Sequence, residues 1–196
     1  MTLLNSVAVF CGSSEGNDPQ IINEAKLLGG LLAEEKIRIV YGGAKIGIMG
    51  EVAQSALNSG GNVIGVLPRF LKRKEVAHLG LTELITVDTM HQRKLKMHEL
   101  SDGFIALPGG FGTLEELFEI LTWGQLGLHK KPIGLLNVNG FYDDLLALLK
   151  KMVHKGFLKP DNHELILVDK SVSNLLQKMK SHTSKQTPAW LTPDKM

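Results

Sequence analysis

In this chain of 196 residues, the segment best suited to chemistry is residues 108–116 (Pro-Gly-Gly-Phe-Gly-Thr-Leu-Glu-Glu). They follow a short apolar run, residues 104–107, and lead into apolar residues at helical spacing. Glycines between a strand and a helix let backbone N–H groups approach an oxyanion, and the helix dipole favours negative charge there. We expect Glu115 and Glu116 in the first turn of that helix. The segment therefore predicts a site for a phosphorylated substrate beside groups suited to acid, base or ion-stabilising chemistry.

Thr113 and Glu116 also fit a purely structural interpretation. A threonine followed three residues later by a glutamate is a capping box, in which both side chains satisfy unpaired N–H groups at a helix N-terminus. A cap does not need the three neighbouring glycines, which favour the anion site instead. Both interpretations stay open, since one acid can be structural while the other takes part in chemistry.

A second candidate is Arg93, in a helix expected over residues 88–101. At helical spacing Arg93 shares a stripe with apolar residues, namely Met90, Met97 and Leu100. It should therefore point toward the interior or a cleft, where an arginine needs a carboxylate or phosphate partner. A pair with Glu116 would keep that glutamate ionised and oriented. The alternative is an arginine whose head reaches solvent at the helix edge.

Short apolar runs alternate with helical patterns along the chain. The expected strands are residues 7–11, 38–41, 62–67, 84–87, 104–107, 133–138 and 165–168. Continuous apolar strands between amphipathic helices are typical of a mostly parallel sheet covered on both faces. The expected fold class is α/β, with a single Rossmann-like doubly wound catalytic domain over residues 1–180. Residues 181–196 are polar and are expected to form a mobile C-terminal tail.

Three of the expected strands end in glycine-rich or small polar turns. Doubly wound folds bind ligands beyond the carboxyl ends of their strands, so these turns should converge on one substrate crevice. Their residues are Cys11, Gly12 and Ser13; Gly42 and Gly43; and Gly109, Gly110, Phe111, Gly112 and Thr113. The second turn matches neither the P-loop nor the dinucleotide fingerprint, and simple turn geometry is its alternative. No base adjoins Cys11 in the sequence, so a nucleophilic role is not expected.

The composition argues against several classes of protein. A net charge of +2, with the basic residues spread along the chain, does not favour a nucleic-acid partner. One cysteine excludes an internal disulfide framework and fits a reducing compartment. The N-terminal residues do not resemble a signal peptide, and no apolar run suggests a membrane span. We therefore expect a cytoplasmic protein without membrane contact, metal or other cofactor.

Residues 108–116 and residues 90–94 (Met-His-Gln-Arg-Lys) occur in the order and spacing of two known signatures. Together they resemble the LOG ("lonely guy") cytokinin riboside 5′-monophosphate phosphoribohydrolases. Residues 122–127 and 131–137 are also similar to this family, and the similarity runs from about residue 7 to residue 167. Members were long labelled lysine decarboxylases, a label that nothing here supports. The resemblance implies hydrolysis of the N-glycosidic bond of adenine-type nucleoside 5′-monophosphates to free base and ribose 5-phosphate.

The resemblance also assigns roles by motif position. It implies that Arg93 and Glu116 are the catalytic pair and that the protein is a homodimer, with the Arg93 helix close to the partner. It implies substrate contacts from Glu75, Lys94, Gly110, Phe111, Gly112, Thr113, Leu114, Glu115 and Thr122. One departure is Ala44, where the family often has a third glycine.

Alternatives to this activity stay open. The substrate could be AMP or a related nucleotide rather than one with a prenyl group on N6. A nucleotide-binding protein without catalysis and a molybdenum-cofactor carrier on a similar fold are further alternatives. The presence of both Arg93 and Glu116 weighs against a binder that has lost catalysis.

Overall fold

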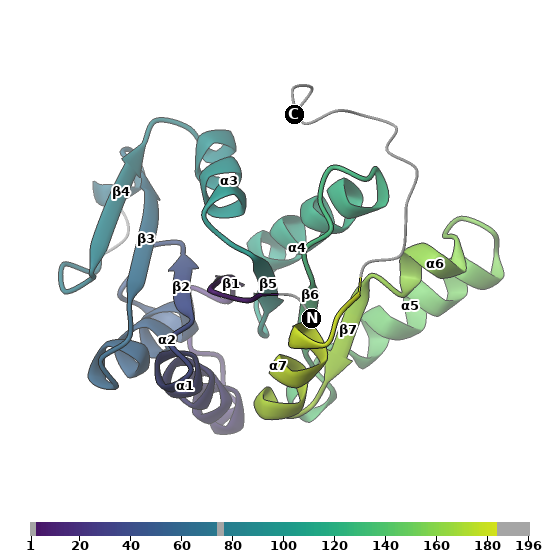
Figure 1. The fold of residues 1–196 in the computed structure, drawn as a ribbon, viewed down its shortest axis with the longest axis horizontal. Helices are drawn as coiled ribbons and strands as arrows, with labels where there is room; N and C mark the ends of the chain where they lie inside the picture. The colour runs from purple at the N-terminus through teal and green to yellow at the C-terminus, as the bar shows by residue number, and fades with distance from the viewer. Residues whose placement is uncertain (1–2, 74–76, 184–196) are drawn as a thin grey trace.

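The computed structural model describes residues 3–73 and 77–183, which form one parallel sheet between two layers of helices (Figure 1). The strand order is β4-β3-β2-β1-β5-β6-β7. The strands are β1 Ser6–Phe10, β2 Arg38–Tyr41, β3 Val63–Pro68, β4 Glu83–Val87, β5 Gly103–Ala106, β6 Ile133–Leu136 and β7 Ile166–Asp169. All seven expected strands are confirmed to within two residues, as is the α/β doubly wound fold.

Three long helices cover each face of the sheet (Figure 1). One layer consists of α1 Pro19–Glu34, α2 Gly47–Asn58 and α7 Val172–Lys180. The other consists of α3 Met90–Glu99, α4 Phe111–Gln125 and α5 Asp143–His154, with the short α6 Pro160–His163 after it. Two 3-10 turns, η1 Leu71–Arg73 and η2 Val138–Gly140, follow β3 and β6.

The central strands are apolar throughout because both of their faces are buried. Along β1, Val7 and Val9 pack in the core beneath α1, α2 and α7, while Ala8 and Phe10 pack in the core beneath α3, α4 and α5. None of these four side chains is more than 4% exposed. This burial explains why the strands appear in the sequence as continuous apolar runs rather than as alternating patterns.

The strand order reverses direction between β1 and β5, which pair with each other. Beyond their carboxyl ends, the Gly12 N–H donates to the Pro108 carbonyl over 3.2 Å. At the opposite ends, the Asp102 carboxylate accepts hydrogen bonds from the Ser6 N–H and hydroxyl, each over 3.0 Å. Such a switch point opens a crevice between the two outgoing loops, and ligands of doubly wound folds bind there.

Part of the expected C-terminal tail lies outside the described residues. Residues 181–183 follow α7 directly, and residues 184–196 are not among those described. Within the described ranges, none of the helices has the length and apolar character needed to cross a bilayer.

A buried aromatic cluster joins α3 and α4 to β5. The His98 ring stacks on Phe104 with centroids 5.6 Å apart and meets the edge of Trp123 at 5.2 Å. His129 lies 5.2 Å from His98, and its Nε2 contacts the Ile120 carbonyl at 2.8 Å while its Nδ1 accepts from the Lys131 N–H. His129 is therefore neutral in this arrangement, because a second ring proton would face another N–H donor.

We expect this cluster to make the protein less stable in mild acid. Burial, with the charge of Lys131, lowers the pKa of His98 to about 3, whereas an unfolded histidine titrates near 6.5. The folded pKa is the lower one, so the contribution to stability is complete above about pH 6.5 and is lost as the pH falls toward 3. Urea unfolding across this range measures the free energy of unfolding.

The variant His98→Phe should reduce this pH dependence, because phenylalanine keeps the stack on Phe104 without a titrating group. The contribution of His129 remains, since burial lowers the pKa of His129 as well. His91→Phe is the matched control, since His91 is exposed on the same helix. Equal pH dependence in wild type and His98→Phe would contradict the assignment.

Candidate active site

Helix α4 begins at Phe111, directly after the N-cap residue Gly110, and no side chain of the described residues caps it. The N–H groups of its first turn have no acceptor within the helix, so they are available to an anion. Thr113 is the third helical residue and not the cap, so the capping-box interpretation is wrong. The placement of Glu115 and Glu116 in the first turn is also wrong. Phe111 and Gly112 take helical conformations, which moves both acids into the second turn.

Gly109 brings the start of α4 against the turn after β1. A Cβ at this position would overlap the Thr113 hydroxyl and lie 2.8 Å from the Gly12 nitrogen. Only a residue without a side chain allows this approach. The close packing places the two glycine turns side by side at the switch point.

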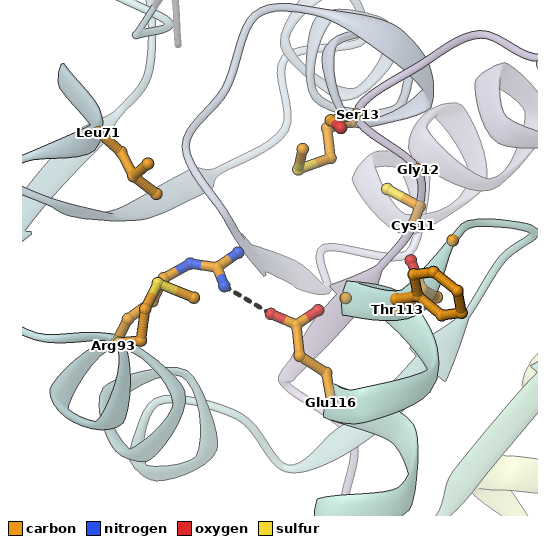
Figure 2. A pocket seen from close by; sticks show the side chains of 12 residues that line it. Cys11, Gly12, Ser13, Leu71, Arg93, Thr113 and Glu116 are labelled. Atoms are coloured by element: carbon orange, nitrogen blue, oxygen red, sulfur yellow. Dashed lines mark hydrogen bonds and ion pairs between the residues drawn. The ribbon is translucent and has the colours of Figure 1, made fainter. Parts of the chain in front are cut away.

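Arg93 and Glu116 point toward one another across the crevice, one from α3 and the other from α4 (Figure 2). Arg93 Nη1 donates to Glu116 Oε1 over 2.6 Å, and Arg93 Nε donates to the Val66 carbonyl over 3.3 Å. The two side chains are only 11% and 9% exposed. The expectation that Arg93 points inward and meets Glu116 is thus confirmed as geometry.

The helix that presents Arg93 starts at a well-defined residue. Thr89 accepts from the Gln92 N–H over 3.1 Å, and the Gln92 side chain accepts from the Thr89 N–H over 3.3 Å. This reciprocal capping box fixes the first turn of α3. Arg93 is the next residue, so its direction into the crevice follows from a rigid helix start.

Burial of Glu116 changes its acidity. Loss of water raises the pKa of Glu116 above its usual range, and the charge and hydrogen bond of Arg93 oppose the rise. A carboxylate with a raised pKa accepts a proton more readily, which suits a general base. Burial and the nearby Glu116 charge also raise the pKa of the Cys11 thiol. Cys11 is therefore a neutral wall of the site and not an activated nucleophile.

The crevice holds a cavity of about 290 Å³. Of the residues expected from the sequence, it is lined by Cys11, Gly12, Ser13, Arg93, Gly110, Phe111, Gly112, Thr113 and Glu116. Three further lining residues were missed, namely Met49, Leu71 and Met90. Met90 could have been found from the sequence, because it shares the helical stripe of Arg93. Met49 and Leu71 could not, because an apolar residue that faces a cavity has the same sequence pattern as one in the core.

Two of the expected contact residues form a second ion-pair cluster beside the cavity. Lys94 Nζ donates to Glu115 Oε1 over 2.5 Å and to Glu119 Oε1 over 2.9 Å. The Lys94 side chain is only 10% exposed. Lys94 and Glu115 are therefore engaged with each other and are not among the residues that line the cavity.

The remaining expected residues also lie off the cavity wall. Leu114 is partly buried and packs against the core on the inner face of α4. The Thr122 hydroxyl donates to the Phe118 carbonyl over 2.7 Å, further along the helix. Gly43 turns the chain with a φ of 79°. Gly42 lies against the Arg93 side chain rather than the open space. Glu75 lies outside the described residues. In the described ranges, no three His, Cys, Asp or Glu side chains group as a metal site.

The chain matches known proteins over most of its length. A family model described as "Possible lysine decarboxylase" matches residues 49–179. Cytokinin riboside 5′-monophosphate phosphoribohydrolase LOG2 of Arabidopsis thaliana is 45% identical over 91% of this chain and 84% of its own length. A cytokinin riboside 5′-monophosphate phosphoribohydrolase of Rhodococcoides fascians is 48% identical over 90% of this chain and 89% of its own.

A solved structure shares the fold at lower identity. The molybdenum cofactor binding protein of Rippkaea orientalis superposes with a TM-score of 0.68 over 92% of this chain and 98% of that protein. The identity is 24%, so the likeness shows a common fold and nothing about the site.

We expect Arg93→Met to destabilise the protein by about 3 kcal/mol at neutral pH, because it leaves a buried carboxylate without its counter-charge. Without Arg93 the folded pKa of Glu116 rises further above the unfolded value. The deficit is therefore largest above that folded pKa and shrinks as the pH falls toward about 4.3. Chemical denaturation at several pH values measures it.

The double variant Arg93→Met/Glu116→Gln is the control, since it buries no charge. It should lose less stability than Arg93→Met and show no pH-dependent deficit. A deficit of the same size and pH dependence in both variants would refute the role given to the charge.

Proposed function

Since this chain belongs to the family of cytokinin riboside 5′-monophosphate phosphoribohydrolases, we propose that it hydrolyses the N-glycosidic bond of these nucleotides. The protein is an N-glycosyl hydrolase that releases a free adenine-type base and ribose 5-phosphate. The observation that carries the proposal is the buried Arg93–Glu116 pair beside the uncapped N-terminus of α4. The family's older description as a lysine decarboxylase finds no support in this site.

The start of α4 binds the phosphate of the substrate. The N–H groups of Phe111, Gly112 and Thr113, which have no acceptor within the helix, and the positive end of the helix dipole favour a dianion there. Glu116, one turn further on, then faces the ribose. The apolar side chains of Met49, Leu71 and Met90 line the same cavity and give the base a dry surface.

Hydrolysis breaks the bond between ribose C1′ and the base and forms a bond from C1′ to a water oxygen. The sugar gains oxocarbenium character, which the Glu116 carboxylate stabilises while it accepts a proton from the attacking water. That proton ends on the departing base, so the products balance. Arg93 stays protonated and cannot act as an acid. Its role is to orient Glu116 and to bind the substrate.

Other functions have less support. Plain AMP would occupy the same phosphate and ribose positions, so the base alone separates the two substrate classes. A nucleotide-binding function without catalysis does not account for the buried Glu116 carboxylate beside the anion site. A molybdenum-cofactor carrier is favoured only by fold, at 24% identity.

We further propose that the protein is a cytoplasmic homodimer that does not bind nucleic acid or membranes, with residues 1–180 as its catalytic domain. The net charge of +2 supports the absence of nucleic acid, and the buried free Cys11 fits a reducing compartment. Exposed apolar side chains on α3 and α4 support a partner surface there, namely Met90, Phe111 and Phe118.

Chromatography of reactions with isopentenyladenosine 5′-monophosphate or AMP tests the activity. We expect free base and ribose 5-phosphate from the prenylated substrate at the higher rate. Faster cleavage of AMP would assign the general nucleotide activity instead. Binding of both nucleotides without cleavage would overturn the enzymatic proposal.

Glu116→Gln should abolish this turnover while the fold stays intact by circular dichroism. Glu99→Gln is the matched control, because Glu99 is a half-exposed carboxylate that pairs with Lys96 away from the cavity. Near-normal turnover in Glu116→Gln would refute the mechanism.

Light scattering at micromolar concentration should show a dimer. Phe118→Glu places a charge on the exposed apolar face of α4 and should shift the protein toward the monomer. A monomeric wild-type protein would contradict the proposed assembly.

A further inference from the structure

The guanidinium of Arg93 is held on two of its three nitrogens. Nε donates to the Val66 carbonyl at 3.3 Å, and Nη1 donates to Glu116 at 2.6 Å. Among residues 3–73 and 77–183, no acceptor takes a hydrogen bond from Nη2. Nη2 is therefore the one guanidinium nitrogen without an acceptor among these residues, on a side chain that lines the cavity.

Gly42 lies directly against this third nitrogen. A Cβ on Gly42 would overlap Arg93 Nη2 and would lie 3.4 Å from Arg93 Cζ and 3.1 Å from Met49 Sδ. Gly42 is buried at the carboxyl end of β2 and does not line the cavity itself. Its φ is not in the left-handed region, unlike that of Gly43, so its backbone does not require glycine.

We propose that Gly42 is a positioning residue of the active site: the missing side chain leaves the space in which the Arg93 guanidinium binds Glu116. This inference rests on the proposed function, because it concerns the pair that carries the reaction. The sequence suggested a substrate contact for Gly42, and the structure places Arg93 there instead.

The empty space at Gly42 matters because the Arg93 guanidinium cannot move without weakening a hydrogen bond to Val66 or Glu116. Non-bonded heavy atoms lie about 3.5–4.0 Å apart, so a methyl group at Gly42 displaces Nη2 by about 1 Å. A shift of that size stretches or misaligns the hydrogen bonds to Val66 or Glu116. Misplacement of a catalytic group by about 1 Å lowers the rate about 100-fold.

A methyl group at Gly42 should affect the stability of the fold less than it affects the activity. The atoms that a Gly42 methyl group would meet are the ends of two flexible side chains, Arg93 and Met49, and not backbone. They can move with a modest loss of stability. Activity and stability should therefore separate in Gly42→Ala, which distinguishes a positioning role from a structural one.

Gly134 provides a matched control in the same sheet. It is buried in β6, and a Cβ there would lie 2.9 Å from Met179 Sδ and 3.2 Å from Leu175 Cδ2, again the ends of flexible side chains. Gly134→Ala therefore adds the same methyl group to the core, away from the cavity. It should lower the melting temperature about as much as Gly42→Ala.

The test measures kcat/KM for isopentenyladenosine 5′-monophosphate against pH, together with thermal unfolding, for wild type and both variants. We expect Gly42→Ala to lose about 100-fold in kcat/KM and its acidic limb to move to higher pH, because Glu116 loses part of its counter-charge. Gly134→Ala should keep the wild-type rate and profile. A rate within about threefold of wild type with an unmoved acidic limb, or an equal loss in Gly134→Ala, would overturn the inference.

A readout independent of turnover separates this inference from the proposed function. Carbon-13 NMR titration of the Glu116 carboxyl should give a higher pKa in Gly42→Ala than in wild type, whether or not the nucleotide is cleaved. Cleavage by wild type with an unchanged Glu116 pKa in Gly42→Ala would refute the role of Gly42 alone. No cleavage by wild type, with the pKa raised in the variant, would refute only the function.

If Gly42→Ala does not fold, the same substitution in the Arg93→Ala/Glu116→Gln background decides the matter. This background removes the arginine side chain, which frees the space that the methyl group needs, and it leaves no buried carboxylate without a partner. Folding of the triple variant would confirm that the conflict is with Arg93. Failure of the triple variant to fold, while Arg93→Ala/Glu116→Gln folds, would show that Gly42 is needed for another reason, and the inference would be wrong.

Discussion

The charges of Arg93 and Glu116 are almost fully buried where α3 meets α4. The arrangement of the residues around them serves to keep the two charges paired. A buried carboxylate or guanidinium is unfavourable unless its partner and its remaining hydrogen bonds are in place. The carbonyl of Val66 takes one nitrogen of Arg93, and Glu116 takes another. β3, the end of β2, the first turn of α3 and the second turn of α4 are thus tied to one ion pair.

The second cluster extends the same contact toward solvent. Lys94 follows Arg93 on α3 and meets Glu115 and Glu119 on α4, so consecutive residues of one helix bind the acids of the other. The inner pair faces the cavity, and the outer cluster closes the helix contact behind it. Together they fix α3 against α4 and orient the Glu116 carboxylate, one turn from the start of α4, where the phosphate is proposed to bind.

Much of this arrangement could be predicted from local pattern. Strands buried on both faces leave continuous apolar runs, and the stripe around Arg93 showed its inward direction. The start of α4 was misjudged because Phe111 and Gly112 are poor helix formers by propensity. Both nevertheless belong to the helix, which begins just after Gly109, the residue in close contact with Gly12 and Thr113. The pairing of Lys94, the apolar walls from Met49 and Leu71, and the contact of Gly42 with Arg93 join segments distant in sequence. No local pattern encodes such contacts.

The connectivity of the fold also sets the entropic cost of closing the chain at two contacts, Arg93–Glu116 and Ser6–Asp102. Arg93 and Glu116 are 23 positions apart, on the two helices that flank β5. Ser6 and Asp102, which join β1 to β5, are 96 positions apart. Closure of the longer loop costs about 1.3 kcal/mol more than closure of the shorter one. The two reacting groups are thus close together in the sequence. The switch-point crevice that receives the nucleotide forms only when segments about half the chain length apart have paired.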